Sequence, residues 1–244
     1  VVGHPGLKTW LRRYLAALPG PRGERGICAH WRLLLPGEWL GERLQALCPE
    51  LSPPAQLPLT ADGAPDLDAL LSTQAGDPWS REALSWRIHA GLGLLDEPAL
   101  RRYLSADRDG RRRVQLARRL ADLYSRYLVY RPDWIAAWEA AEPPSHPGRG
   151  TPTADDWQAR LWRALATDAA AAGGAHRAQA VAQALDRLRL QRDARALPPP
   201  GAPALHVYAS QHLPPDALEL ALAESIHMPV HLYFAEPCRE LWED

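Results

Sequence analysis

The residues near the start of the chain with the clearest potential for chemistry are Gly3, Gly6, Lys8 and Thr9. A phosphate-binding loop needs Gly-Lys-Ser/Thr without interruption after four spacer residues, so that backbone amides and the ammonium group converge on the phosphates. Here Leu7 separates Gly6 from Lys8, and the upstream spacing is short. The pattern favours a strand-to-helix turn over a nucleotide site, so no cofactor is expected.

His227 and His231 are four residues apart, the spacing with which two histidines bind one metal ion from a helix. Pro229 and the alternation after it predict a strand, in which this spacing does not converge, and no third ligand stands nearby. Ser210 lacks the flanking glycines of a hydrolase nucleophile, and no clustered acids indicate a two-metal nuclease. We therefore expect neither a metal site nor a catalytic residue.

Residues 206–222 have the frame of a Walker B segment, with a buried strand, a Pro-containing turn and a Leu-rich helix. The frame is kept by Val207, Gln211, Pro215, Leu218, Glu219 and Leu220. In a working superfamily-1 helicase the strand ends in Asp-Glu, which hold Mg²⁺ and position the attacking water. Tyr208 and Ala209 stand at those positions and can do neither. The segment predicts a helicase-like core that does not hydrolyse ATP.

The composition fits a protein of 244 residues with an ordinary apolar content and a net charge of -1, so no bulk attraction to polyanions is implied. Three widely spaced cysteines favour a reduced, cytoplasmic protein. No run of about 18 apolar residues indicates a membrane span. The chain opens on Val1 and not on Met, which favours a fragment of a longer protein.

The periodicity of apolar residues predicts a helical centre between two α/β pieces. Helices are expected over 7–18, 38–47, 79–95, 98–104, 111–130, 133–140, 155–172, 175–190 and 215–225, and strands over 1–2, 27–30, 205–209 and 230–234. The fold class is α/β. Residues 1–48 and 191–244 form one part, because a lone pair of parallel strands cannot bury both faces, and residues 49–190 form a large helical insertion.

Several segments closely resemble the RecC family, the gamma subunit of exodeoxyribonuclease V (RecBCD). They are residues 100–104, 121–123 and 127–134, the last reading Tyr-Leu-Val-Tyr-Arg-Pro-Asp-Trp, with further matches at 6–11, 231–234 and 237–242. The resemblance implies an N-terminal RecC fragment with an inactive superfamily-1 helicase (P-loop NTPase-like) fold. The two α/β pieces would form a 1A-like part and the insertion a 1B-like part.

In that family the unwound 3′ strand passes through a tunnel and is scanned for the Chi sequence, while RecB supplies the motor and the nuclease. The resemblance thus implies DNA repair by homologous recombination in the bacterial cytoplasm. Single-stranded DNA, RecB-like and RecD-like subunits are the expected partners, with no membrane.

Of the positions that contact the Chi sequence in the RecC family, some are identical in this chain and others differ. Identical residues here are Leu35, Asp122, Leu123, Arg131 and Arg177. Thr9 and Arg126 stand at two further positions but differ in type, and they remain DNA-binding candidates. Gly3, Pro5, Gly41 and Ser125 also differ, with the loss of amide, hydroxyl or aromatic groups that read or stack on bases. These departures predict a recognition sequence other than the familiar Chi, or none.

Simpler interpretations remain open for these residues. Residues 101–131 contain ten arginines and three aspartates, which would also form a solvated helix face with Asp122 paired to Arg118 and Arg126. Arg131 would also pair with Asp133 at a helix junction, and most of the ten tryptophans are expected in the core. The rival functions are a scaffold that docks RecB without touching DNA and an active ATP-dependent helicase or nuclease.

Overall fold

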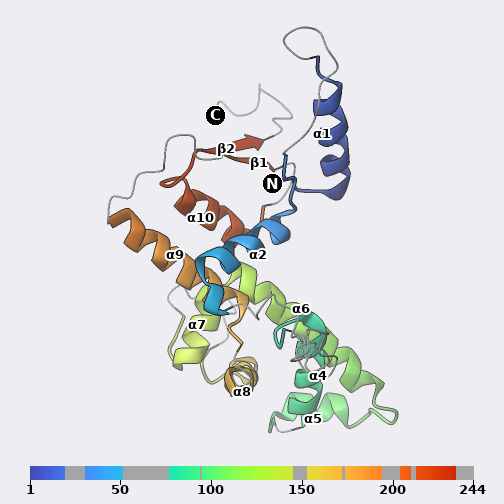
Figure 1. The fold of residues 1–244 in the computed structure, drawn as a ribbon. Helices are drawn as coiled ribbons and strands as arrows, with labels where there is room; N and C mark the ends of the chain where they lie inside the picture. Colours follow the sequence, from blue (N-terminus) through green and yellow to red (C-terminus); the bar gives the residue numbers. More distant parts are fainter. Residues whose placement is uncertain are drawn as a thin grey trace, which may run out of the picture. The chain divides into compact units, whose positions relative to one another are not determined.

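The computed structural model describes residues 1–19, 31–51, 77–93, 95–144, 153–171, 174–193, 204–209 and 213–234. Its elements in chain order are α1 (Pro5–Ala17), α2 (Pro36–Leu47), the 3-10 helix η1 (Pro49–Leu51), α4 (Arg81–Gly91), α5 (Pro98–Leu104), α6 (Arg111–Tyr130), α7 (Pro132–Ala140), α8 (Trp157–Ala171), α9 (Arg177–Asp193), β1 (Leu205–Ala209), α10 (Pro215–Glu224) and β2 (Val230–Phe234), as labelled in Figure 1.

The chain divides into two compact units. Unit 1 consists of Val1–Pro49 and Val181–Asp244, and unit 2 consists of Glu50–Ala180. Helix α9 crosses from unit 2 into unit 1. Unit 1 thus combines the two ends of the chain, and unit 2 is the intervening helical part.

A small parallel sheet forms the centre of unit 1. β1 and β2 pair in parallel, from Leu205 opposite Val230 to Ala209 opposite Phe234, and Val2 forms a parallel bridge to Tyr208 on the other side of β1. Helix α10 connects the two strands and packs against β2. The described residues are otherwise mostly helical, so the α/β class is compatible with the structure.

Helices α1 and α2 also belong to unit 1. The side chains of Leu11, Val2 and Leu33 form a small buried cluster. Trp10 and Tyr14 of α1 are exposed, and their rings stack on each other with centroids 5.0 Å apart. Positions 7, 11 and 15 share one face of a helix, whereas 10 and 14 lie on the neighbouring one.

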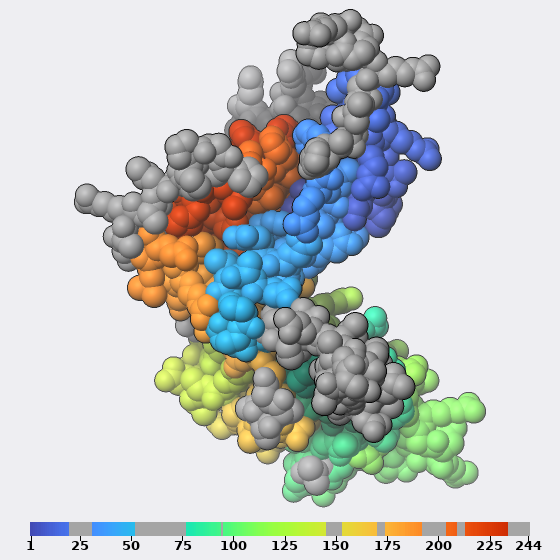
Figure 2. Space-filling model, in the orientation of Figure 1, coloured from blue at the N-terminus to red at the C-terminus, as the bar shows by residue number. Residues whose placement is uncertain are grey.

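A buried ion pair joins α2 to α10. Arg43 donates from Nε to Glu224 Oε1 at 2.5 Å, and the Glu224 side chain is 1% exposed. Figure 2 shows the surface of α2, in lighter blue, against that of α9 and α10, in orange and red. A buried carboxylate of this kind requires its cation, because an unpaired charge in the interior is strongly destabilising.

Unit 2 is built on a long amphipathic helix. Along α6 the buried residues are Ala117, Leu120, Ala121, Tyr124 and Leu128. They pack with Leu84, Ile88, Ile135, Trp138, Leu161 and Trp162 of the neighbouring helices in one core. The expectation that most of the tryptophans at helical spacing pack in the core is confirmed, since Trp138 and Trp162 are fully buried and Trp134 and Trp157 pack against the core.

Helix α4 begins two residues later than the sequence predicted and ends at Gly91. Its N-cap is Ser80, whose hydroxyl accepts from the amide of Ala83, whereas Asp77 accepts from the amide of Trp79 in the preceding turn. A serine is as good a cap as an aspartate, so local signals alone did not distinguish the two.

Other predicted bounds are confirmed. Helices 98–104 and 111–130 and strands 205–209 and 230–234 have the predicted ends. The expected strand at 27–30 lies outside the described residues. No helix in the described ranges is long and apolar enough to cross a bilayer.

Candidate nucleic-acid interface

The hydrogen-bond donors in the turn before α1 and in its first residues bind other groups of the protein. The amide of Gly6 donates to His4 Nδ1 at 2.9 Å, and Lys8 Nζ lies 3.2 Å from Glu38 Oε2. The same carboxylate accepts from the amide of Leu35 at 2.8 Å, and these two donors, the amide first, lower the pKa of Glu38. The ammonium group is therefore engaged in linking α1 to α2, in agreement with a strand-to-helix turn.

Thr9 and Leu35, the two candidates in unit 1, differ in exposure. Thr9 is exposed on α1, and its hydroxyl lies 3.5 Å from the carbonyl oxygen of Pro5. Leu35 is the N-cap residue of α2 and packs, half-buried, against the Val2 and Leu11 cluster. Thr9 can offer its hydroxyl to a ligand, whereas Leu35 contributes mainly to packing.

Aromatic rings of β1 stack on those of β2. The ring of Tyr208 stacks on Tyr233 of β2, with centroids 4.4 Å apart and planes 7° from parallel. Burial first, and the neighbouring phenol second, raise the pKa of Tyr208. Two positions before, His206 stacks on His231 at 4.8 Å. Among the described residues no three His, Cys, Asp or Glu side chains gather as a metal site would require.

Asp122 has a partner that the sequence did not predict. Its carboxylate forms an ion pair with Arg81 of α4, and not with Arg118 or Arg126 of its own helix. The pair crosses from α6 to α4, and only the tertiary structure could reveal it. One carboxylate has about four acceptor sites, so Asp122 retains capacity for a further donor.

The outer face of α6 is basic around Asp122. Arg118, Arg119 and Arg126 are exposed, and no ion pair to them occurs within the part of the chain that the structure describes. Leu123, by contrast, is half-buried and packs against the core of unit 2. Asp122 and Arg126 thus lie together on the accessible side of the helix, and Leu123 lies toward its core side.

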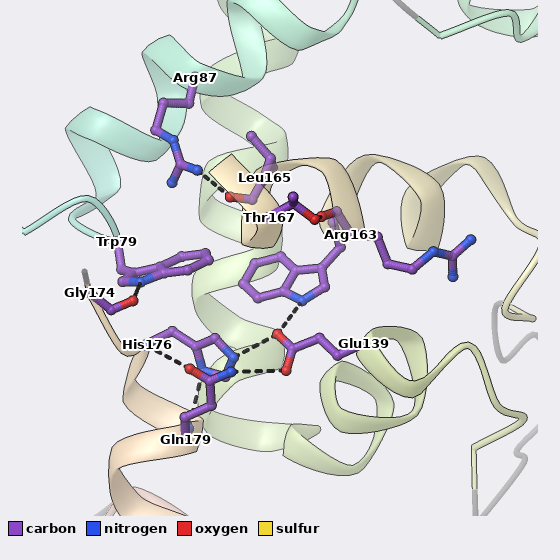
Figure 3. A network of polar contacts seen from close by, with 10 residues as sticks. Trp79, Arg87, Glu139, Arg163, Leu165, Thr167, Gly174, His176 and Gln179 are labelled. Carbon is purple, nitrogen blue, oxygen red and sulfur yellow. Dashed lines mark hydrogen bonds and ion pairs between the residues drawn. The ribbon is translucent and has the colours of Figure 1, made fainter. Parts of the chain in front are cut away.

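Other arginines of unit 2 have structural partners. Arg113 donates to the carbonyl oxygen of His89 at the end of α4, and Arg163 donates to that of Trp138 at the end of α7. Arg87 donates to the carbonyl of Leu165 on α8 (Figure 3). The carbonyl of His89 lies in the last turn of α4, where carbonyls lack an intrahelical donor. Arginine abundance by itself therefore does not indicate DNA binding here.

Arg131 lies at the junction of α6 and α7. Its Nε and Nη2 lie 3.0 and 2.8 Å from the two carboxylate oxygens of Asp133, and its guanidinium carbon lies 3.9 Å from the ring centre of Trp134. The hydrogen bonds from Arg131 lower the pKa of Asp133. The simpler interpretation, pairing with Asp133 at the helix junction, is confirmed. DNA contact by Arg131 remains a prediction.

Arg177, the last candidate, is the first residue of α9 and follows a buried polar network (Figure 3). His176 Nδ1 accepts from the amide of Gln179, and the amide of His176 donates to Gln179 Oε1, which is a reciprocal capping pair. His176 Nε2 contacts Glu139 Oε1 at 2.8 Å. The same oxygen accepts from the indole of Trp162 at 3.0 Å. The network fixes the start of α9 and thus the backbone of Arg177.

The DNA-binding candidates of unit 2 fall into two groups. Asp122 and Arg126 are accessible on α6, whereas Arg131 and Arg177 lie at the starts of α7 and α9. The set missed by sequence reasoning includes Arg81, which holds Asp122, and the exposed pair Trp10 and Tyr14 in unit 1. No sequence signal pointed to Arg81, because its partner lies 41 positions away in the numbering. An exposed stacked pair of rings is a surface on which unpaired bases stack.

Comparison with known proteins identifies the family. The family model described as RecC, N-terminal domain, matches residues 67–244. The chain belongs to this family, as the resemblance indicated.

Three relatives with the name RecBCD enzyme subunit RecC illustrate the similarity. The protein from Escherichia coli (strain K12) is 35% identical over 173 residues, which cover 68% of this chain and 15% of that protein. The Haemophilus influenzae protein is 27% identical over 266 aligned residues, which cover 100% of this chain and 21% of that protein. The Mycobacterium tuberculosis protein (strain H37Rv) is 29% identical over 257 aligned residues, which cover 99% of this chain and 20% of that protein. The chain spans about one fifth of the length of these relatives, or less.

Proposed function

We propose that this chain is the DNA-facing N-terminal part of a RecC subunit, which receives an unwound single strand in a RecBCD-type helicase-nuclease. Membership of the RecC family and the names of the relatives support this proposal. RecB-like and RecD-like subunits would be the partners, and repair of DNA breaks by homologous recombination in the bacterial cytoplasm would be the process. Residues 1–48 and 191–244 would form the helicase 1A-like part, with 49–190 as the 1B-like insertion.

The observation that carries the proposal is the outer face of α6. Arg118, Arg119 and Arg126 are exposed there around Asp122, whose carboxylate is held by Arg81. Arginines in this arrangement neutralise phosphates and position a strand. A carboxylate among them accepts from a cytosine amino group and so contributes base selectivity.

Catalysis would belong to the partner subunits. Tyr208 and Ala209 end β1, and neither side chain is a Mg²⁺ ligand or a base. We therefore expect no ATP hydrolysis by the chain alone, and its role would be to bind and guide the strand.

The test is fluorescence anisotropy of a labelled single strand against the chain at several salt concentrations. Binding should weaken with salt, and Arg126→Glu and Arg177→Glu should each lower the affinity and reduce the salt slope by about 1 for each phosphate that is no longer neutralised. Arg32→Glu, at an exposed arginine of unit 1 that pairs with Glu42, is the control for a change of total charge. Equal losses of affinity for all three variants would contradict a localised DNA path.

A scaffold that docks RecB without touching DNA is the second candidate. The pairing of Arg131 with Asp133 and the core packing of Leu123 favour it, because both give candidate residues a structural purpose. Folded protein by circular dichroism with no salt-dependent binding would support the scaffold. If DNA binds, competition between short strands of different sequence tests the expectation that the familiar Chi is not the preferred one.

A further inference from the structure

A groove runs between α4 and α6 in unit 2, and of the three exposed arginines on the proposed DNA-facing side of α6 only Arg118 lines it. Its volume is about 430 Å³. It is lined by Arg81, Glu82, Ser85, Trp86 and His89 from α4, and by Val114, Ala117 and Arg118 from α6. The two helices run in opposite directions here, because Arg81 pairs with Asp122 near one end and Arg113 reaches the carbonyl of His89 near the other.

The groove exposes a large aromatic ring. The Trp86 side chain is 60% exposed, and its only ring partner among the described residues is His89, with ring centres 6.0 Å apart and planes 72° from parallel. Trp79, Trp138 and Trp162 of the same unit are buried. Leaving an indole in water forgoes the stabilisation of burying it, and an exposed aromatic in a concave site is typical of a surface that binds a partner.

Two arginines line the same groove. Arg81 and Arg118 line the groove, with Glu82 as the acid among the lining residues. Arg118 is exposed and forms no ion pair with any described residue. A flat apolar platform next to a guanidinium group matches a nucleotide, whose base stacks and whose phosphate is anionic. A purely apolar protein helix would match the ring but would leave Arg118 without an anionic partner.

The face of α6 that carries Arg118 also carries residues of the proposed DNA path. Arg118, Asp122 and Arg126 are spaced four residues apart, so they share one face of the helix at steps of about 6 Å. Arg81 belongs to both places, since it lines the groove and holds Asp122. A strand lying along this face would pass from the groove directly to Asp122.

We propose that the groove between α4 and α6 holds one unpaired nucleotide, with its base against Trp86 and its phosphate against Arg118, beside the nucleotide that contacts Asp122. The proposal rests on the proposed function, because it adds a site to the same single-stranded path. Trp86 supplies stacking without regard to sequence, and Arg81 positions the Asp122 carboxylate next to it.

The experiment compares two probes with the full chain, a labelled oligothymidylate and a labelled abasic strand of equal length, which has the same phosphates but no bases. The unmodified chain should prefer the thymidylate strand. Trp86→Ala should weaken binding of that strand by about 5- to 150-fold, which corresponds to about 1–3 kcal/mol for one base at 1.4 kcal/mol per tenfold. It should leave abasic-strand binding nearly unchanged, and Trp86→Phe should restore most of the preference.

Two control variants separate the site from general effects. Tyr103→Ala removes another exposed ring of unit 2, on α5, and should not reduce the preference for bases. Arg111→Ala removes a cation from the same helix that pairs with Asp109, and it should weaken both strands less than Arg118→Ala does. Circular dichroism verifies that each variant is folded.

Each outcome decides the proposal. A loss of base preference in Trp86→Ala but not in Tyr103→Ala supports it. Equal effects of these two variants, or no effect of either, would overturn the nucleotide site while leaving the proposed function intact. If the unmodified chain binds neither strand, the proposed function and the site fall together. If a RecB-like subunit bound at the groove and the chain showed no preference for the thymidylate strand, the occupant would be a protein, which would also overturn the proposal.

Discussion

Replacing Glu139 with alanine should destabilise unit 2, because its carboxylate is the shared acceptor of a polar network (Figure 3). Glu139 Oε1 accepts from Trp162 Nε1 at 3.0 Å and lies 2.8 Å from His176 Nε2, and Oε2 accepts from Gln179 Nε2 at 3.1 Å. Since His176 Nδ1 accepts from a backbone amide, the ring proton of the neutral imidazole is on Nε2 and donates to Glu139.

The magnitude follows from the donors that would be left without a partner. Trp162 is fully buried, and the His176 side chain is 2% exposed, so water cannot replace the carboxylate at either group. Each unsatisfied buried donor costs about 1–3 kcal/mol, and the loss of a partner in a buried network costs about 3–5 kcal/mol. For a chain of this size the expected fall in melting temperature is roughly 6–20 °C.

The assay is thermal unfolding of the full chain followed by circular dichroism. Glu139→Gln keeps an acceptor and should cost only about 1–2 kcal/mol. Glu142→Ala removes an exposed carboxylate from the same segment and should change stability by less than about 0.5 kcal/mol. If Glu139→Ala had the same melting temperature as the Glu142→Ala control, the network would not contribute to stability and the reasoning would be refuted.

The same network predicts a dependence on pH. Burial raises the pKa of Glu139, but the hydrogen bonds from His176, Trp162 and Gln179 outweigh it, so the pKa is lowered from 4.5. The stabilisation is therefore complete above the unfolded pKa and is lost as pH falls through the folded value. Unfolding curves between pH 7 and about 3 should show this loss in the unmodified chain and a smaller one in Glu139→Gln.

Three further predictions concern both units. Arg43→Ala should cost about 3–5 kcal/mol, because it leaves Glu224 buried without its cation, whereas Arg32→Ala, at an exposed pair, should cost less than about 1 kcal/mol in urea unfolding. Burial first, and the adjacent histidine of β2 second, lower the pKa of His206. Unit 1 should therefore lose stability as pH falls below about 6.5, and His206→Asn should reduce that loss. Gly174→Ala should cost about 1–3 kcal/mol in thermal unfolding, since the added Cβ would lie 2.8 Å from a prolyl Cγ.

Local patterns in the sequence determined most of the elements. Residues 111–130 repeat apolar side chains at helical spacing, and the structure has that helix with the same ends. Residues 205–209 and 230–234 are short apolar strands joined by one helix, a pattern that specifies a parallel pair. These features depend on neighbours a few residues apart, and for this reason the sequence is sufficient to predict them.

Partner choice between elements was decided only by the tertiary structure. Asp122 has two arginines on its own helix at favourable spacing, yet it pairs with Arg81 across the groove. Trp10 shares the apolar character of Leu11 but is exposed, because only the face of α1 that carries Leu11 packs against the buried cluster. Ion pairs and burial are set by which helix faces which, and that packing depends on contacts between residues far apart in the chain.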